Sequence, residues 1–405
     1  MPTISERLAC LIALPALAMG VYLSAKLAIA DSLFRANTPE SVARAARLEP
    51  GNAAYHQMLA EHLESLGRSS ESERELAARL SPMESEYWIG LGVLAESQAD
   101  YARAQKDLLE AAGIDAKFAP RWALMNFYFR RQNAGQFWLW TRQALEISYG
   151  DLTPVFRLCW LMTDDADKIA GVIPRRKDIE LKYLAFLTDT HRFEAAPKIA
   201  LNVAREAAPE DVPGLLAWCD AAIHADPDAA REVWSTLCRK KLLPFDPLSL
   251  EKGDLITNGR FQTTPTEHGF DWKIPQVDGV FVTTGSPIEG VSVELSGDQP
   301  EDCVVLSQFI PAAPAGRYRL NVQYNSPDEE DDSGFSWEIA GPASGAPLAR
   351  SADLPLGTNT RTENVDFSAG ANRLLKLSLR YKRPLGRVRR KETLVIHQVG
   401  IDLVR

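Results

Sequence analysis

Two carboxylates stand beside tryptophans in the second half of this 405-residue chain, and they are the side chains best suited to act on a sugar. Asp271 precedes Trp272, and Glu338 follows Trp337. Hydrolysis of a glycosidic bond needs two carboxyl groups that flank the bond. Nothing in the sequence fixes the separation of Asp271 and Glu338. A glycosidase that uses this pair is therefore not the leading interpretation. A glycan-active enzyme with the first half of the chain as its catalytic domain is kept as a separate alternative.

Other catalytic chemistry lacks its usual motifs. The sequence contains no G-x-S-x-G, Walker A, H-E-x-x-H or G-x-G-x-x-G motif. The six histidines stand singly, and the five cysteines include no C-x-x-C pair, so no zinc or thioredoxin-like site is indicated. We expect a binding protein rather than an enzyme, with no catalytic residue and no required cofactor.

The charge of the chain limits its partners. A formal net charge of -9 argues against a general nucleic-acid binder, which needs a basic surface. Five acidic residues run from Asp328 to Asp332, and seven basic residues crowd the segment from Arg380 to Lys391. We expect solvated loops that keep sheet edges from pairing. The alternative is a basic hairpin that contacts phospholipid headgroups or an acidic polysaccharide.

An apolar segment near the N-terminus predicts contact with a membrane over residues 8–30. Leu8 to Leu23 is almost wholly apolar and carries no charge. One interpretation is an uncleaved anchor that reaches Ala30, with Lys26 extending its amine to the surface. The other is a signal peptide, removed by cleavage before Asp31. We expect a bacterial-type inner-membrane protein with a periplasmic body, or a periplasmic or secreted protein after cleavage.

Aromatic residues recur at a fixed spacing in the first half. Tyr55, Trp88 and Trp122 stand 33 and then 34 residues apart, a period typical of stacked helix pairs. Leu91, Gly92, Ala104 and Ala111 follow Trp88 at the offsets of a tetratricopeptide repeat. The chain resembles tetratricopeptide-repeat proteins over residues 36–148, most specifically at the Trp88 unit. The resemblance implies a helical stack that docks a protein partner.

The segment Phe137-Trp138-Leu139-Trp140 is the best candidate for a binding groove on that stack. Two tryptophans two positions apart on a helix cannot both face one core. We therefore predict that Trp138 and Trp140 anchor a partner. Packing between repeats is the alternative, because a stack of helix pairs needs bulky side chains to fill it.

The pattern changes after Leu243-Pro244-Phe245-Asp246-Pro247, where two prolines interrupt helix propagation. Beyond it, apolar and polar residues alternate in strand-like runs such as 318–324 and 375–381. About eight strands without helices predict a two-sheet sandwich of jelly-roll type. The predicted fold is thus an α + β multidomain chain: a membrane segment (1–30), an all-α repeat stack (36–245) and an all-β sandwich (252–405).

Three motifs of the last part carry a second resemblance. Asn258-Gly259-Arg260-Phe261, Gly316-Arg317-Tyr318-Arg319-Leu320 and the closing Gly400-Ile401-Asp402-Leu403-Val404 are similar to strands of jelly-roll carbohydrate-binding modules. The resemblance implies a glycan ligand. It also implies a structural calcium between the first and last strands, held by Asn258 and Asp402. Gln262 stands where an acidic residue is usual, which puts the calcium in doubt.

Sugars stack on exposed aromatic rings, and the sandwich offers Trp272, Trp337 and Tyr381 as candidates. Core packing is the alternative for each, and Tyr324 is expected to be buried because it is in phase with Leu320 and Val322. These predictions describe a non-enzymatic scaffold of the cell envelope, with a protein partner on the repeats and a polysaccharide on the sandwich, in polysaccharide assembly or export. A structural spacer that binds no sugar is a further alternative.

Overall fold

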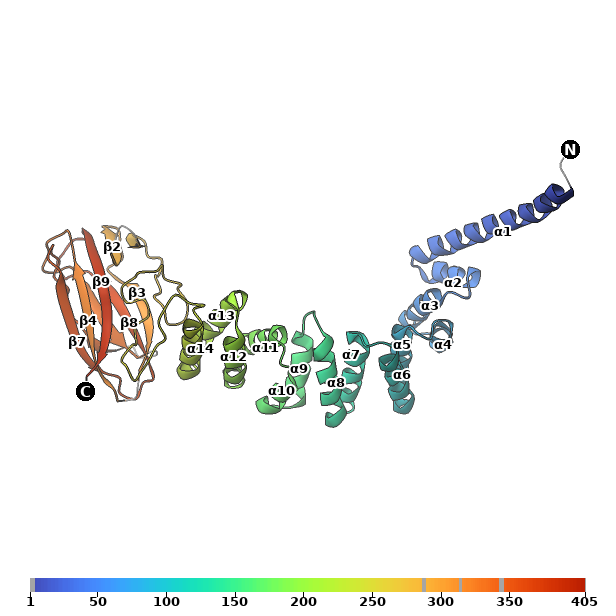
Figure 1. Cartoon of the computed structure of the whole chain (residues 1–405), viewed down its shortest axis with the longest axis horizontal. Coiled ribbons are helices and arrows are strands. Elements are labelled where there is room, and N and C mark those ends of the chain that lie inside the picture. The colour runs from blue at the N-terminus through green and yellow to red at the C-terminus, as the bar shows by residue number, and fades with distance from the viewer. Residues whose placement is uncertain (1–3, 286–288, 313–314, 342–345, 405) are drawn as a thin grey trace. The chain divides into compact units, whose positions relative to one another are not determined.

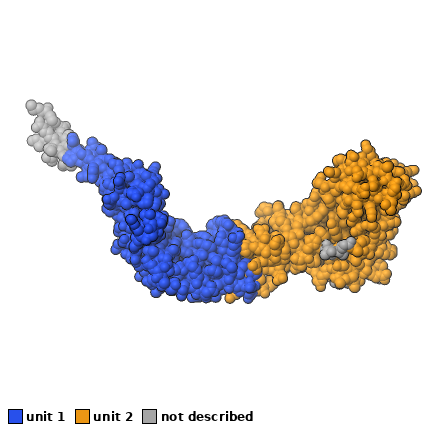
Figure 2. All heavy atoms as spheres, turned by 180° about the vertical axis from the view of Figure 1, so that it is seen from behind, with its two compact units in different colours: residues 1–165, 172–174 blue, residues 166–171, 175–405 orange. Residues whose placement is uncertain are grey.

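The computed structural model describes residues 4–285, 289–312, 315–341 and 346–404, with side chains from residue 13 onward. These residues form fourteen α-helices followed by nine strands (Figure 1). The predicted α + β fold is confirmed. The chain divides into two compact units, 1–165 with 172–174 and 166–171 with 175–405 (Figure 2). Since this division falls within the helical part, the domain bounds 36–245 and 252–405 stay a prediction.

The first unit is a series of helices joined by short turns. The predicted repeat is visible in its register, because Tyr55, Trp88 and Trp122 fall near the beginnings of α3, α5 and α7, and each of these helices packs on the next one along the chain. The helices are α1 (Ile4–Arg35), α2 (Pro39–Leu48), α3 (Ala53–Ser65), α4 (Glu71–Leu80), α5 (Ser85–Ser97), α6 (Tyr101–Ile114), α7 (Phe118–Arg130), α8 (Ala134–Ile147) and α9 (Thr153–Met162).

Small residues set the distance between α5 and α6. A Cβ atom on Gly92 would lie 2.6 Å from Cγ of Leu108 and 3.2 Å from the backbone oxygen of Ala104, closer than packed atoms approach. Ala104 and Ala111 are fully buried on the facing side of α6. The glycine and alanines of the repeat motif therefore act through close helix packing, as the sequence predicts.

The second unit begins with five helices. Its core includes Trp218 and Trp234, both almost without exposed surface. The helices are α10 (Ala166–Val172), α11 (Lys177–Asp189), α12 (Pro197–Glu206), α13 (Val212–Ala222) and α14 (Pro227–Arg239), with short 3-10 turns at Phe193–Ala195 and Pro209–Asp211. A long segment without regular elements then leads from α14 to the first strand.

Two antiparallel sheets complete this unit. One has the strand order β1-β2-β9-β4-β7 and the other β3-β8-β5-β6. The strands are β1 (Val280–Thr284), β2 (Val291–Ser296), β3 (Asp302–Pro311), β4 (Arg317–Asn325), β5 (Phe335–Ala340), β6 (Pro347–Arg350), β7 (Arg361–Ser368), β8 (Leu374–Lys382) and β9 (Lys391–Leu403). The predicted sandwich is confirmed.

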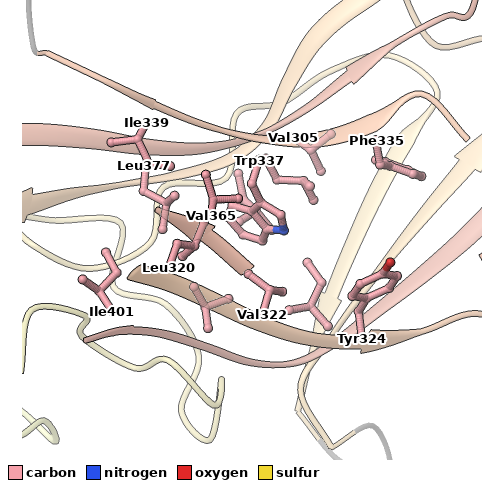
Figure 3. Close-up of a cluster of buried hydrophobic side chains, with 14 of the residues drawn as sticks. Val305, Leu320, Val322, Tyr324, Phe335, Trp337, Ile339, Val365, Leu377 and Ile401 are labelled. Carbon is pink, nitrogen blue, oxygen red and sulfur yellow. The ribbon is translucent and has the colours of Figure 1, made fainter. Parts of the chain in front are cut away.

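The sandwich core lies between the sheets, where alternate residues of each strand meet. On β4, Tyr318, Leu320, Val322 and Tyr324 are buried while their neighbours are more exposed. Leu320 faces Ile401 across β4 and β9, which places the closing strand in the middle of its sheet. Figure 3 shows Leu320, Val322 and Ile401 meeting side chains of the opposite sheet, such as Trp337. Burial of Tyr324 follows the phase of its strand, as predicted.

Candidate functional site

A cavity of about 760 Å³ opens in the second unit, where the segment between α14 and β1 meets β4 and β9. Residues 244–249 and 252–260 form most of its wall, and Asn321, Gln398 and Asp402 come from the two strands. The structure thus brings the predicted pair Asn258 and Asp402 to one cavity, although 144 positions separate them in the sequence.

Asn258 closes the loop that forms the wall. It has a positive φ of 53°, a conformation that asparagine tolerates better than most residues. Its side-chain nitrogen donates to the backbone oxygen of Thr263 at 2.7 Å, and its side-chain oxygen accepts from the Thr263 amide at 3.4 Å. The next residue, Gly259, accepts a 2.8 Å hydrogen bond from the Val399 amide and leaves no room for a Cβ atom. The Asn-Gly motif therefore ties this loop to β9.

Asp402, on β9, accepts a 2.7 Å hydrogen bond from the side-chain amide of Asn321. The amide groups of Asn258 are engaged with Thr263, as described above. Within the described ranges, no three histidine, cysteine, aspartate or glutamate residues come together as metal ligands. The calcium site at Asn258 and Asp402 stays a prediction.

Phe245 gives the cavity an aromatic wall. Its ring is half-buried and stacks on that of Trp234, with centroids 5.9 Å apart and an interplanar angle of 12°. Trp234 is held in turn by Phe270, at 6.2 Å between centroids. Because Trp234 is fully buried, it fixes the orientation of Phe245. In the sequence, Phe245 stands between Pro244 and Pro247. The prolines predict the end of a helix there, but nothing in the pattern predicts a binding role for Phe245.

The rest of the wall carries polar side chains that are free to bind. In the described part of the chain, six charged or amide side chains of the wall form no side-chain hydrogen bond or ion pair. They are Asp246, Lys252, Asp254, Arg260, Gln262 and Gln398. The six side chains comprise acidic, basic and amide groups. A polar cavity with one fixed aromatic ring suits a ligand that has many hydroxyl groups and one apolar face.

The three aromatics predicted to contact sugar lie in the sandwich core instead. Trp272 and Trp337 have no exposed surface and Tyr381 has 3%. Figure 3 shows Trp337 inside the cluster of Leu320, Val322 and Ile339. A ring enclosed on all sides cannot stack on a sugar from solvent, so the structure corrects this prediction. Trp272 nevertheless contacts the cavity wall, since its Nε1 donates a hydrogen bond to the backbone oxygen of Asn258 at 3.2 Å.

The two carboxylates beside these tryptophans are engaged within the protein. Asp271 is fully buried and accepts hydrogen bonds from the Thr266 amide at 2.7 Å and the Trp272 amide at 2.8 Å. Burial raises the pKa of Asp271. Glu338 pairs with Arg350 at 2.6 Å. Each carboxylate thus has a structural explanation, and neither is among the residues of the cavity wall.

On α8, Trp138 and Trp140 flank an exposed side chain and follow a buried one. Phe137 is fully buried, and its ring meets that of Trp138 at 4.7 Å between centroids. Both tryptophans are half-buried, while Leu139 between them is exposed. Neither is wholly in the core, as the spacing predicts. The partner groove at Trp138 and Trp140 stays a prediction.

The acidic run and the basic segment meet in the folded chain. Arg387 lies 3.3 Å from Asp332 and 3.7 Å from Glu330, and Arg390 also contacts Glu330. Arg383 pairs separately with Glu301. Ion pairs between the acidic run and the basic segment therefore involve two of the basic side chains, Arg387 and Arg390. Lys382, Arg389 and Lys391 are exposed and make no ion pair in the described part of the chain.

Comparison with known proteins finds similarity of fold. No family model matches the chain, and no curated protein does. Similar solved structures include one described as "CBM4 structure and function", 12% identical, covering 37% of this chain and 99% of that one at a TM-score of 0.30. Another is pilF of Pseudomonas aeruginosa, 16% identical, covering 55% and 91% at 0.28. A third is the enzymatically active domain of bacteriophage CBA120 tailspike protein 4, 16% identical, covering 38% and 21% at 0.27. At these scores the likenesses say nothing of ligand or partner.

Proposed function

We propose that this chain is a non-enzymatic, membrane-attached scaffold of the cell envelope that binds a glycan in the cavity lined by Phe245. The observation that carries the proposal is the combination of one fixed aromatic ring with six free polar side chains. Sugars are recognised in this way, by stacking of the apolar ring face and hydrogen bonds to the hydroxyl groups. A volume of about 760 Å³ accommodates a short oligosaccharide.

The balance of charges in the cavity favours a binding role over a catalytic one. A glycosidase needs a carboxyl pair at a distance set by its mechanism, between about 5 and 9.5 Å. Asp271 is saturated by backbone amides and Glu338 by arginine. Asp246 and Asp254 line the cavity, and both are exposed. The glycan is therefore held without being cut.

The helical stack supplies the second part of the proposal, docking of a protein partner. Leu139 is exposed on α8 between the half-buried Trp138 and Trp140, an arrangement in which apolar side chains can anchor a partner. With the body in the periplasm, such a protein would hold a polysaccharide beside the machinery that assembles or exports it.

Glycan binding is tested with the full-length chain in detergent on an array of bacterial polysaccharide fragments. Retention of one structural class of glycan supports the proposal. Absence of binding across the array sinks it and favours the spacer. Loss of the bound oligosaccharide with release of a shorter product indicates the enzyme.

Docking is tested by a photo-crosslinking residue in place of Leu139, with Leu161, exposed on α9, as the matched control. A discrete adduct from position 139 alone is expected.

A further inference from the structure

Helix α1 is continuous through two different environments. Over Ala13–Arg35 it is long and apolar enough to cross a bilayer, and no other helix of the described residues is. Leu14 and Leu17 are each 71% exposed, whereas Ala30, on the same helix, has no exposed surface. The helix therefore changes from exposed to packed within one continuous element.

The packed end of α1 belongs to the helical stack. Ala30 lies in a small core with Ala45 and Ala46 of α2 and Tyr55 of α3, against which Leu33 and Phe34 also pack. The rings of Phe34 and Tyr55 are 4.8 Å apart between centroids. These contacts make the last three turns of α1 the partner of α2, in the manner of the helix pairs that follow.

One ion pair ties the helix to the stack at the level of the expected membrane surface. Nζ of Lys26 lies 3.0 Å from Oε1 of Glu49, and both side chains are about three-quarters buried. Lys26 is the first charged residue after Arg7, and the 18 uncharged residues between them span about 27 Å as a helix, close to the thickness of a bilayer core. Lys26 thus marks the end of the span.

Cleavage before Asp31 would remove part of this structure. It would take away Lys26 and Ala30, and leave only Asp31 to Arg35 of the helix. A remnant of less than two turns does not hold a helical conformation on its own. Ala45, Ala46 and Tyr55 would then lose the surface that covers them. The signal-peptide interpretation conflicts with the packing of the first helix pair.

We propose that α1 is retained in the mature protein as a single helix that spans a lipid bilayer and forms the first helix of the stack. The exposed apolar side chains from residue 13 to Leu23 contact lipid. Because no linker separates the two parts, the α1–α2 pair lies directly at the headgroups. This inference does not depend on glycan binding.

The test uses the full chain expressed in bacterial membranes. Intact mass should show the N-terminal segment in place, and the protein should stay in the membrane pellet after alkaline carbonate. A mass that begins at Asp31 overturns the proposal. Full-length protein that carbonate extracts overturns the lipid assignment and shows that another surface, such as a second copy, covers α1.

Charge reversal tests the link between the span and the stack. Lys26→Glu places a carboxylate against Glu49, so limited proteolysis within the first helices should become several-fold faster. Glu49→Lys should have a similar effect, and the double swap should return the rate toward that of the wild type. If Lys26→Glu leaves proteolysis unchanged while Glu49→Lys accelerates it, Lys26 is absent from the mature protein and the proposal fails. Carbonate extraction of each variant controls for membrane insertion.

Discussion

Asp220 on α13 and His268 in the segment before β1 are joined by a hydrogen bond of 2.6 Å between Oδ2 and Nδ1. The other oxygen of Asp220 accepts from the Gly269 amide at 2.8 Å and from Nζ of Lys273 at 3.0 Å. One carboxylate of a helix thus holds three donors that lead into the sandwich. The last helices and the sandwich are therefore fastened to each other within one compact unit.

Removal of this carboxylate should destabilise the second unit. Asp220→Ala leaves the Gly269 amide and Lys273 without their acceptor, at a cost of about 1–3 kcal/mol in the free energy of unfolding. Denaturant unfolding of the full chain measures the change. Asp353→Ala, at an exposed aspartate with no side-chain partner in the described part of the chain, is the matched control. Equal stability of the two variants would show that the cluster contributes nothing.

The same cluster predicts a dependence on pH. Burial raises the pKa of Asp220, but the hydrogen bonds from His268, Gly269 and Lys273 outweigh it, so the pKa lies below its ordinary value. A carboxylate with a depressed folded pKa adds stability above its unfolded pKa, about 4, and loses it as the pH falls further. The stability difference between wild type and Asp220→Asn should be constant near neutrality and shrink below about pH 4. A difference that persists unchanged into acid contradicts this assignment.

Phe245 is predicted to contribute directly to ligand affinity. Phe245→Ala should weaken binding of any glycan selected on the array by roughly tenfold, about 1.4 kcal/mol, because it removes the stacking surface. Titration calorimetry measures the dissociation constant. Phe281, exposed on β1 and outside the cavity wall, provides the control, and Phe281→Ala should leave the affinity unchanged. Equal losses in both variants would show that the ligand binds elsewhere.

Gly92 is predicted to be intolerant of even one added carbon. Gly92→Ala forces a Cβ atom against Leu108, and we expect a loss of about 1–3 kcal/mol in the stability of the helical stack. Gly113, on α6, has open space around its Cα atom, so Gly113→Ala should be neutral or stabilise by up to about 1 kcal/mol. Thermal unfolding followed by circular dichroism compares the two. A neutral Gly92→Ala would mean that α5 and α6 are not held at this distance.

Local patterns predicted the elements well. The spacing of Tyr55, Trp88 and Trp122 reports helix pairs because packing between neighbours repeats the same side-chain sizes. Alternation along β4 reports a strand with one buried face. The phase that predicted burial of Tyr324 was also available for Trp337, which alternates with Ser336 and Glu338. The same alternation predicts a buried Trp337, and the ring has no exposed surface.

The cavity and the Asp220 cluster could not be predicted in this way. Both depend on where an irregular segment comes to lie, and its path follows from tertiary contacts rather than from periodicity. Asp220 and its three donors are separated by 48 to 53 positions. Phe245 gains its position from Trp234, a side chain that the sequence marks only as part of a helix. Asn258 and Asp402 were found because a motif resemblance, unlike a local pattern, carries information on distant parts of the chain.

Trp234 connects the cavity to the end of the helical segment. Its ring supports Phe245 and lies so close to Gly269 that a Cβ atom there would be 2.7 Å from it. Binding that depends on the position of Phe245 is thus thermodynamically linked to the packing of α14. If packing of α14 increases the affinity for the ligand, then ligand binding must increase the stability of packed α14. Linkage requires that the two free-energy changes are equal. Ligand binding in the cavity should therefore be detectable at α14, for example as slower hydrogen exchange of its backbone amides.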